Sequence, residues 1–266
     1  MSEIEETVHI VPLGHEFDRA VKPFRKYRAD RVYILAVTDT LEKYSEEMIK
    51  KQIYYLERVV KALRDLGIKV ELRNIDMFDM LELLGCMSRI TVEEKKRGNR
   101  IYINISSAGR LASAATILVA MAHGAKAYYV TAERYSESPE EKMEHGLSIC
   151  KETPKVQVIE TFPLQLPDED GIKVLIKLCL EGREMTTPEL AEYLARKGVE
   201  GFKGCEDWSK IPREKRINYL MTLNKRILNK LENSGYITRE KRGRYNRIKI
   251  TRGGLYIAHL SGQLPK

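Results

Sequence analysis

Long hydrophobic runs are missing from the sequence. No apolar stretch approaches the roughly 18 residues that cross a bilayer, and the acidic start of the chain does not follow the basic-then-apolar pattern of a signal peptide. We therefore expect a protein that stays in the cytoplasm and has no membrane partner. Its hydrophobic content of 43% and charged content of 32% are typical of globular proteins.

Cysteine is scarce and scattered, which argues against a disulfide framework or a zinc site. The four cysteines form no CxxC pair, and His145 and His259 have no partners at the spacing of metal ligands. We expect neither a metal nor a cofactor. The four residues, interpreted as core or surface thiols, are Cys86, Cys150, Cys179 and Cys205.

Two glycine-rich nucleotide motifs are also absent. Neither GxGxxG, which holds a dinucleotide pyrophosphate, nor GxxxxGK[ST], which cradles nucleotide phosphates, follows the first predicted strand. The chain therefore lacks the signatures of nicotinamide-dependent dehydrogenases and of P-loop nucleotide hydrolases. Any anion that it binds must be held in another way.

Basic charge is concentrated in one part of the chain. The net charge is +8 overall, but residues 1–170 hold 25 Lys and Arg against 28 Asp and Glu, whereas residues 171–266 hold 21 against 10. The first part is close to neutral and the second has a net charge of +11. A basic module of this size indicates a phosphate-rich partner such as nucleic acid.

Apolar runs of β type alternate with helical periods in the first 167 residues. This alternation predicts a doubly wound, parallel, Rossmann-like α/β domain with helices on both faces of its sheet. The acidic, turn-rich stretch PDEDG then marks a boundary, so we expect domains at 1–167 and 168–266. The expected strands are residues 7–13, 31–37, 68–75, 100–105 and 126–132.

The stretch NISSAGR joins the fourth predicted strand to an apolar helix. In a parallel sheet this junction lies at the carboxyl edge, where helix N-termini offer free N–H groups and a positive dipole. Ser106 and Ser107 are expected either to cap the helix or to donate to a phosphate. Gly109 lets backbone approach a ligand, and Arg110 adds a planar cationic fork. With the comparable loop PLGHEFDR after the first strand, the sequence predicts an anion site.

These stretches carry a resemblance to a known family. NISSAGR fits the pattern [DN]-x-[ST]-x-x-x-[RK] of CARF domains, the CRISPR-associated Rossmann-fold sensors of cyclic oligoadenylates, with Asn104, Ser106 and Arg110 at its fixed positions. PLGHEFDRAVKPFRKYRADRVYILAV resembles their first strand, ligand loop, helix and second strand. In order and architecture, almost the whole chain resembles the archaeal CARF regulators that end in a winged helix.

The resemblance implies a two-fold homodimer with a cyclic oligoadenylate, expected to be cyclic tetraadenylate, across its axis. Relatives with two glycines in the fourth loop differ from this chain, which has Ser107 and Ala108 there, so the ring size stays open. The implied ligand-binding residues are Leu13, Gly14, His15, Asp18, Arg19, Thr38, Asp39, Asn104, Ser106, Ser107, Gly109 and Arg110.

Two alternatives for this domain remain. Some CARF domains cleave their ligand, so the chain is alternatively a metal-independent ring nuclease in which His15, Ser106 or Ser107 positions the ribose 2′-oxygen. It is alternatively a repressor that responds to another nucleotide.

The helix after NISSAGR carries no Asp, Glu, Lys or Arg from Leu111 to Ala125. A helix that is apolar nearly all round must be buried on more than one side. Its own sheet would cover one side, and the small residues near its start would permit close packing against a second subunit.

Beyond residue 167 the pattern changes to two helices, a longer helix and a basic hairpin, which is the order of a winged helix-turn-helix. LNKLENSGYITREKRGRYNRIKITRGG resembles the end of many such domains. The third helix is expected over about 213–233, with Ile217, Leu220, Leu223, Ile227 and Leu231 at apolar spacing. Trp208, before it, is expected to be a packing anchor.

A winged helix-turn-helix presents the third helix to the major groove of double-stranded DNA and the wing to phosphates or the minor groove. We therefore expect a transcriptional regulator whose DNA affinity responds to the ligand. The expected DNA-binding residues are Arg216, Tyr219, Thr222, Lys225, Arg226 and Asn229 on the helix, and Arg242, Arg244, Tyr245 and Arg247 in the wing.

Overall fold

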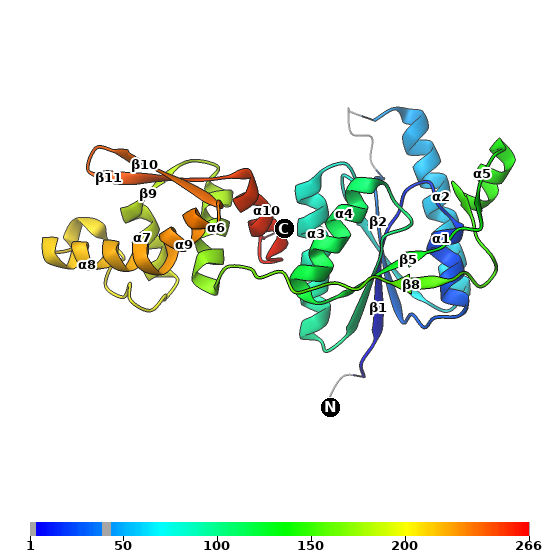
Figure 1. Cartoon of the computed structure of the whole chain (residues 1–266), viewed down its shortest axis with the longest axis horizontal. Helices are drawn as coiled ribbons and strands as arrows, with labels where there is room; N and C mark the ends of the chain where they lie inside the picture. The colour runs from blue at the N-terminus through cyan, green and yellow to red at the C-terminus, as the bar shows by residue number, and fades with distance from the viewer. Residues whose placement is uncertain (1–3, 39–43, 266) are drawn as a thin grey trace. The chain divides into compact units, whose positions relative to one another are not determined.

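The computed structural model describes residues 4–38 and 44–265 (Figure 1). The chain divides into two compact units, with the division between Leu164 and Gln165. Each unit has its own hydrophobic core.

The N-terminal unit is built around a six-stranded sheet with the order β3-β2-β1-β4-β5-β8. The first five strands run parallel, and β8 pairs antiparallel with β5. The predicted doubly wound α/β sheet is confirmed. The strands are β1 (Thr7–Pro12), β2 (Arg31–Ala36), β3 (Lys69–Asn74), β4 (Arg100–Asn104), β5 (Lys126–Val130) and β8 (Val156–Val158).

Helices lie on both faces of this sheet, as Figure 1 shows: α1 and α2 on one, α3 and α4 on the other. The central strands β1 and β2 are buried along their whole length, as expected for parallel strands covered on both sides. The helices are α1 (Asp18–Val21), continued by the 3-10 turn Lys22–Arg25, then α2 (Glu46–Asp65), α3 (Met80–Lys96) and α4 (Arg110–His123).

A small flap follows β5 and packs onto the loop after β1. It consists of the hairpin strands β6 (Arg134–Tyr135) and β7 (Ser148–Ile149) with α5 (Pro139–His145) between them. The Leu147 N–H donates to the His15 carbonyl at 3.1 Å, and the Phe17 N–H donates to the His145 carbonyl at 3.1 Å. The flap therefore fixes the backbone of the loop after β1.

The C-terminal unit is a winged helix-turn-helix. Its third helix is continuous through α8, a π-helical turn and α9, as predicted, and the wing is the β10–β11 hairpin. The elements are α6 (Glu169–Glu181), β9 (Met185–Thr186), α7 (Thr187–Arg196), the 3-10 turn Trp208–Lys210, α8 (Arg213–Leu223), the π-helical turn Asn224–Leu228, α9 (Asn229–Asn233), β10 (Ile237–Arg242), β11 (Tyr245–Ile250) and α10 (Arg252–Leu260).

The core of this unit differs from the predicted pattern at the start of the third helix. Leu223, Ile227 and Leu231 are buried as expected, but Leu220 is only half-buried and the Ile217 side chain is 51% exposed. Since Ile217 lies in the second turn of α8, the apolar face of this helix reaches the core only from its third turn onward.

In the described ranges 4–38 and 44–265, no helix is long and apolar enough to cross a membrane.

Replacing Gly146 by alanine is expected to destabilise the N-terminal unit and to displace the flap. Gly146 has a φ of +88°, and an added Cβ would lie 2.6 Å from the Glu16 Cα, so the substitution combines backbone strain with a clash against backbone. We expect a loss of roughly 2–4 kcal/mol in the free energy of unfolding, measured by urea denaturation.

Gly67→Ala is the matched control. Gly67 has a φ of +77° but has nothing within 4 Å of an added Cβ, so it measures backbone strain alone, about 1 kcal/mol. Equal losses for the two variants would show that the contact between the flap and the loop contributes nothing.

Candidate functional site

The loops that follow β1 and β4 lie side by side at the carboxyl edge of the sheet. The Gly14 N–H donates to the Ser107 carbonyl at 2.7 Å, and the Ser107 hydroxyl donates to the Pro12 carbonyl at 2.8 Å. Because the chain reverses its direction of winding between β1 and β4, this edge is a topological switch point. Open α/β sheets bind their ligands in the crevice at such a point.

The polar residues of NISSAGR mostly support this edge from within. Asn104 is 1% exposed; its amide donates to the Arg19 carbonyl at 2.9 Å, and its oxygen accepts from the Ser106 N–H at 2.7 Å. The Ser106 hydroxyl accepts from the Val130 N–H at 2.6 Å. Both serine hydroxyls are therefore engaged with backbone, and these three side chains position the loop.

The start of α4 carries the exposed part of the motif. Gly109 is the N-cap, no side chain caps the helix, and Arg110 is the exposed first helical residue. Of the two alternatives for Ser106 and Ser107, capping of this helix is wrong, because the two hydroxyls bond to the Val130 N–H and the Pro12 carbonyl instead. An uncapped helix N-terminus beside a guanidinium group favours an anion.

Two further residues of the expected set form the accessible rim of the site. His15 is half-buried and stacks on Tyr55 with ring centroids 5.6 Å apart, and Thr38, two residues after β2, is also half-buried. Burial and the positive charge of Lys51 lower the pKa of His15. Lys51 lies on α2 and belongs to no motif, so sequence reasoning missed this second cation near the first loop.

Two of the expected ligand residues are not observed in this rim. Leu13 is fully buried in the core beneath α1 and α2, so its side chain does not line an accessible wall. Asp39 lies outside the described residues.

Asp18 and Arg19 form a buried layer behind the first loop. The Asp18 carboxylate accepts from the Cys150 N–H at 2.8 Å and pairs with Lys22 at 2.8 Å. The Arg19 guanidinium donates to the Ser106 carbonyl at 3.4 Å and to the Tyr129 hydroxyl at 3.2 Å. Arg19 therefore bridges the first loop to the fourth.

Glu16 is buried between this loop and the flap. One carboxyl oxygen accepts from the Ser148 hydroxyl at 2.8 Å, while the other is buried without a partner among the described residues. Burial raises the pKa of Glu16 to about 7, although Ser148 and Arg19 oppose the shift. Around neutral pH this side chain is thus partly protonated.

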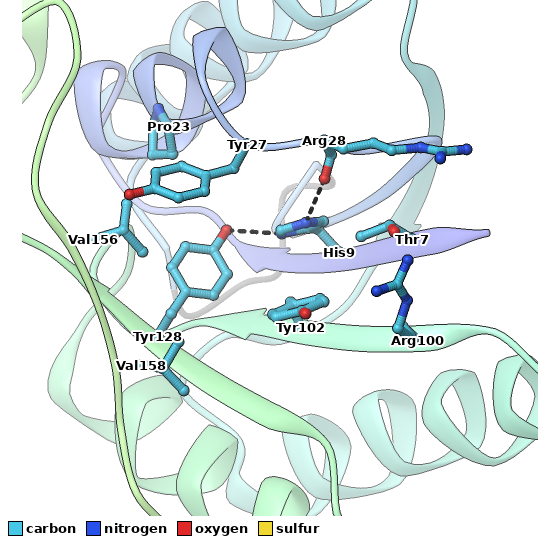
Figure 2. Close-up of a pocket in the computed structure, with 10 residues that line it drawn as sticks. All are labelled: Thr7, His9, Pro23, Tyr27, Arg28, Arg100, Tyr102, Tyr128, Val156 and Val158. Atoms are coloured by element: carbon cyan, nitrogen blue, oxygen red, sulfur yellow. Dashed lines mark hydrogen bonds between the residues drawn. The ribbon is translucent and has the colours of Figure 1, made fainter. Parts of the chain in front are cut away.

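A hollow of about 240 Å³ lies on the sheet near the amino ends of β1 and β4, away from this edge (Figure 2). Its arginines are already paired: Arg28 contacts Asp30 at 2.9 Å and Arg100 contacts Glu5 at 2.8 Å. The hollow therefore offers apolar contact without excess positive charge. Its lining includes the rings of His9, Tyr27, Tyr102 and Tyr128.

His9 adds no charge to this hollow. Burial lowers the pKa of His9 to about 4, its Nδ1 lies 3.2 Å from the Tyr128 hydroxyl, and its Nε2 lies 3.2 Å from the Arg28 carbonyl (Figure 2). The imidazole is neutral at physiological pH and is already fully bonded. An anion is better held at the carboxyl edge.

In the C-terminal unit, three expected DNA-binding residues of the third helix make contacts within the unit. Arg216 donates to the Ser209 carbonyl at 2.9 Å, and Tyr219 donates to the Lys203 carbonyl at 2.7 Å. Arg226 donates to the Glu200 carbonyl and to the Asp170 carboxylate, each at 2.8 Å. Lys225 and Asn229 are exposed and Thr222 is half-buried.

The wing carries both free and paired exposed arginines. Arg244 and Arg247 are exposed, whereas Arg242 pairs with Glu240 at 2.7 Å and with Glu184 at 3.6 Å. The Arg244 guanidinium lies over the Tyr245 ring, 5.5 Å from its centre.

Trp208 is buried at the foot of the wing. Its indole N–H donates to the Tyr245 hydroxyl at 3.1 Å, and its side chain is 8% exposed. The prediction that Trp208 is a packing anchor is confirmed.

No group of three or more His, Cys, Asp and Glu side chains within residues 4–38 and 44–265 is arranged to hold a metal ion.

The buried carboxyl predicts a distinctive pH dependence of stability. Between pH 4.5 and about 7, Glu16 is ionised in the unfolded chain but still protonated in the native protein, so its contribution to stability falls as the pH rises. The full loss is on the order of 3 kcal/mol. His9 acts in the opposite direction between pH 4 and 6.5, because only the unfolded chain is protonated there.

Glu16→Gln should remove the decrease in stability that Glu16 causes as the pH rises, and should leave the contribution of His9 unchanged. We expect the free energy of unfolding of this variant, relative to the parent protein, to increase by roughly 3 kcal/mol between pH 4.5 and 7.5. Urea denaturation at four pH values measures this difference. Parallel profiles for variant and parent would contradict the assignment of a protonated, buried Glu16.

Family comparisons match the two units separately. Residues 7–135 match the family described as "HFX_2341_N:-like, N-terminal". Residues 170–262 match the family described as "DUF6293 C-terminal winged helix domain". A curated relative, an uncharacterized protein of Methanocaldococcus jannaschii, is 26% identical over 203 residues; the match covers 69% of this chain and 58% of that protein. The chain therefore spans little more than half of its relative.

Solved structures of similar topology are distant in sequence. Enterococcus italicus Csm6 bound to cyclic hexa-2′-fluoro-hexa-dAMP has 14% identity and a TM-score of 0.43, with 82% of this chain and 60% of that chain covered. Can2 from Sulfobacillus thermosulfidooxidans in complex with cyclic tetra-adenylate has 10% identity and a TM-score of 0.40, with 95% and 62% covered. The N-terminal unit is therefore similar to the HFX_2341-like family over residues 7–135, and the C-terminal unit is similar to the DUF6293 winged helix family over residues 170–262.

Proposed function

We propose that this protein is a ligand-responsive DNA-binding transcriptional regulator. The observation that carries the proposal is the joining of the two loops at the switch point of the sheet, beside the uncapped start of α4 and Arg110, in a chain that also contains a basic winged helix. The first feature suits a phosphorylated ligand, and the second suits duplex DNA. The boundary near residue 167 would separate sensing from DNA binding.

The proposed ligand is a cyclic oligoadenylate, with cyclic tetraadenylate as the first choice. Support comes from the CARF-like motif and from the accessible backbone at Gly14 and Gly109. Arg110 and Lys51 would neutralise phosphates, and Thr38 and His15 would contact ribose or adenine. Asn104, Asp18 and Arg19 would act by positioning the loops.

The proposed active unit is a homodimer with α4 at the two-fold axis. One side of this helix is buried on the sheet, but Leu111 is 38% exposed, Ala114 is exposed, and Leu118 is half-buried. A row of small and apolar side chains permits close approach of a second copy. Ligand bound across the axis would then contact the first and fourth loops of both subunits.

Regulation requires that the ligand prefer one arrangement of the two winged helices. A tenfold change in DNA affinity needs a coupling free energy of about 1.4 kcal/mol. A few phosphate contacts that form in only one arrangement would supply this difference.

Ring cleavage is the second proposed activity, and His15 favours it. Its lowered pKa leaves a neutral imidazole that can accept a proton from a ribose 2′-hydroxyl. Ser106 and Ser107 are poorer candidates because their hydroxyls are engaged with backbone.

Calorimetric titration with cyclic tetraadenylate tests the sensing function. Cyclic hexaadenylate, linear oligoadenylate and NAD serve as comparisons, and the recovered ligand is analysed for cleavage. One intact ring per two chains supports the dimeric sensor, and linear product supports the nuclease. Absence of binding by every cyclic ligand would favour a repressor that responds to another nucleotide.

Arg110→Ala should abolish ligand binding and leave basal DNA binding unchanged, because its guanidinium lies on the N-terminal unit beside the start of α4. Calorimetry and gel-shift titration measure the two affinities on one preparation. Arg244→Ala in the wing is the matched control and should show the reverse. Weaker DNA binding by Arg110→Ala without ligand would contradict the assignment of roles.

The wing should contribute to the salt dependence of DNA binding in proportion to its exposed charge. Arg244→Ala and Arg247→Ala should each reduce the slope of log K against log[salt] by roughly one unit if each removes a phosphate contact. Arg242→Ala should reduce it less, because Arg242 is paired with Glu240 and Glu184. Equal slopes for all four proteins would indicate a partner other than DNA.

A further inference from the structure

The first three turns of the third helix expose an unusual set of side chains. The long polar groups expected there are turned into the unit: Arg216 contacts Ser209 and lies 5.9 Å from the Trp208 ring, and Tyr219 contacts Lys203. These contacts hold the segment before α8 in place. They remove both side chains from the outer face of the helix.

Two apolar side chains are exposed on the outer face of the helix instead. Ile217 is 51% exposed and Met221 is 49% exposed, and their spacing of four residues puts them next to each other on one face of α8. Asn218 and Lys225 are exposed beside them. A single exposed apolar residue is ordinary, but an adjacent pair at the start of a DNA-facing helix has a chemical use.

We propose that Ile217 and Met221 recognise thymine through its C5-methyl group in the major groove. This inference rests on the proposed DNA-binding function and adds to it a class of sequence. The major groove displays one apolar group, the thymine methyl, and apolar side chains contact it specifically. The N-terminal turns of a recognition helix are the part that reaches base edges, and both residues lie in the N-terminal half of the third helix, which runs from Arg213 to Asn233.

The charge around the pair favours DNA over a protein as the occupant of this face. Arg213, Lys215 and Lys225 are exposed on the same helix, and the wing adds Arg244 and Arg247. A polyanion satisfies these charges, and its phosphates would flank the bases that the apolar pair contacts. The expected target is therefore a duplex with thymine at two nearby positions of each half-site.

Replacement of thymine by deoxyuridine tests the contact because it removes only the methyl group. The full chain would first select duplexes from a random pool, and each thymine of the selected duplex would then be replaced singly. We expect binding to weaken roughly fourfold at one or two thymines, which corresponds to about 0.8 kcal/mol for one buried methyl group. Other thymines should tolerate the change.

Protein variants assign each sensitive thymine to a side chain. In Ile217→Ala and Met221→Ala, the deoxyuridine penalty should vanish at one thymine each. Met221→Gln keeps the length of the side chain but makes it polar, and this variant should also lose the deoxyuridine penalty. Leu180→Ala is the control, since Leu180 is 57% exposed on α6, outside the third helix, and its penalties should equal those of the parent protein. Thermal unfolding of each variant checks that it is folded.

Four results would overturn the inference, and they are distinguishable. Undiminished penalties in the variants, or a selected duplex insensitive to deoxyuridine, would remove thymine recognition while leaving the regulator intact. Failure to select any duplex would remove the proposed DNA-binding function as well. Dissociation of a dimer by Ile217→Ala and Met221→Ala, with unchanged deoxyuridine penalties, would identify the pair as a subunit interface.

Discussion

The joining of the loop after β1 to the loop after β4 is the constraint on which the candidate ligand site depends. Two backbone-directed hydrogen bonds, from Gly14 to Ser107 and from Ser107 to Pro12, hold the loops at one edge. These bonds require that β1 and β4 be neighbours, which the parallel order of the sheet provides. The polar residues of NISSAGR thus build the site mainly by fixing backbone, and they leave the first turn of α4 open to an anion.

The layer behind the loops is built from buried charged residues. Asp18 and Lys22 pair with each other and with backbone groups. The Arg19 guanidinium donates to the Ser106 carbonyl and the Tyr129 hydroxyl, while its Nε has no partner among the described residues. Glu16 remains incompletely satisfied and responds by holding its proton. The flap closes over these groups, so the geometry of the first loop depends on residues more than a hundred positions away in sequence.

The winged helix uses its arginines in two ways. The insertion before α8 requires Arg216 and Tyr219 to hold it, and the start of α6 requires Arg226 to pair with Asp170. Those side chains stabilise the unit. Lys215 and Lys225 of the third helix and the exposed arginines of the wing remain for a polyanion. Net positive charge alone therefore overstates the number of residues that are free to contact DNA.

The sequence by itself determined the fold of both units and their order, because apolar periodicity reports which faces of strands and helices are buried. It also located NISSAGR at the carboxyl edge, since a strand followed by a helix has only one such end. Tertiary structure alone decided the roles of side chains. Ser106 faces the sheet rather than the helix N-terminus, and Ile217 faces solvent rather than the core, because hydrogen bonding and packing depend on partners distant in sequence. The proximity of Lys51 to His15 has the same origin.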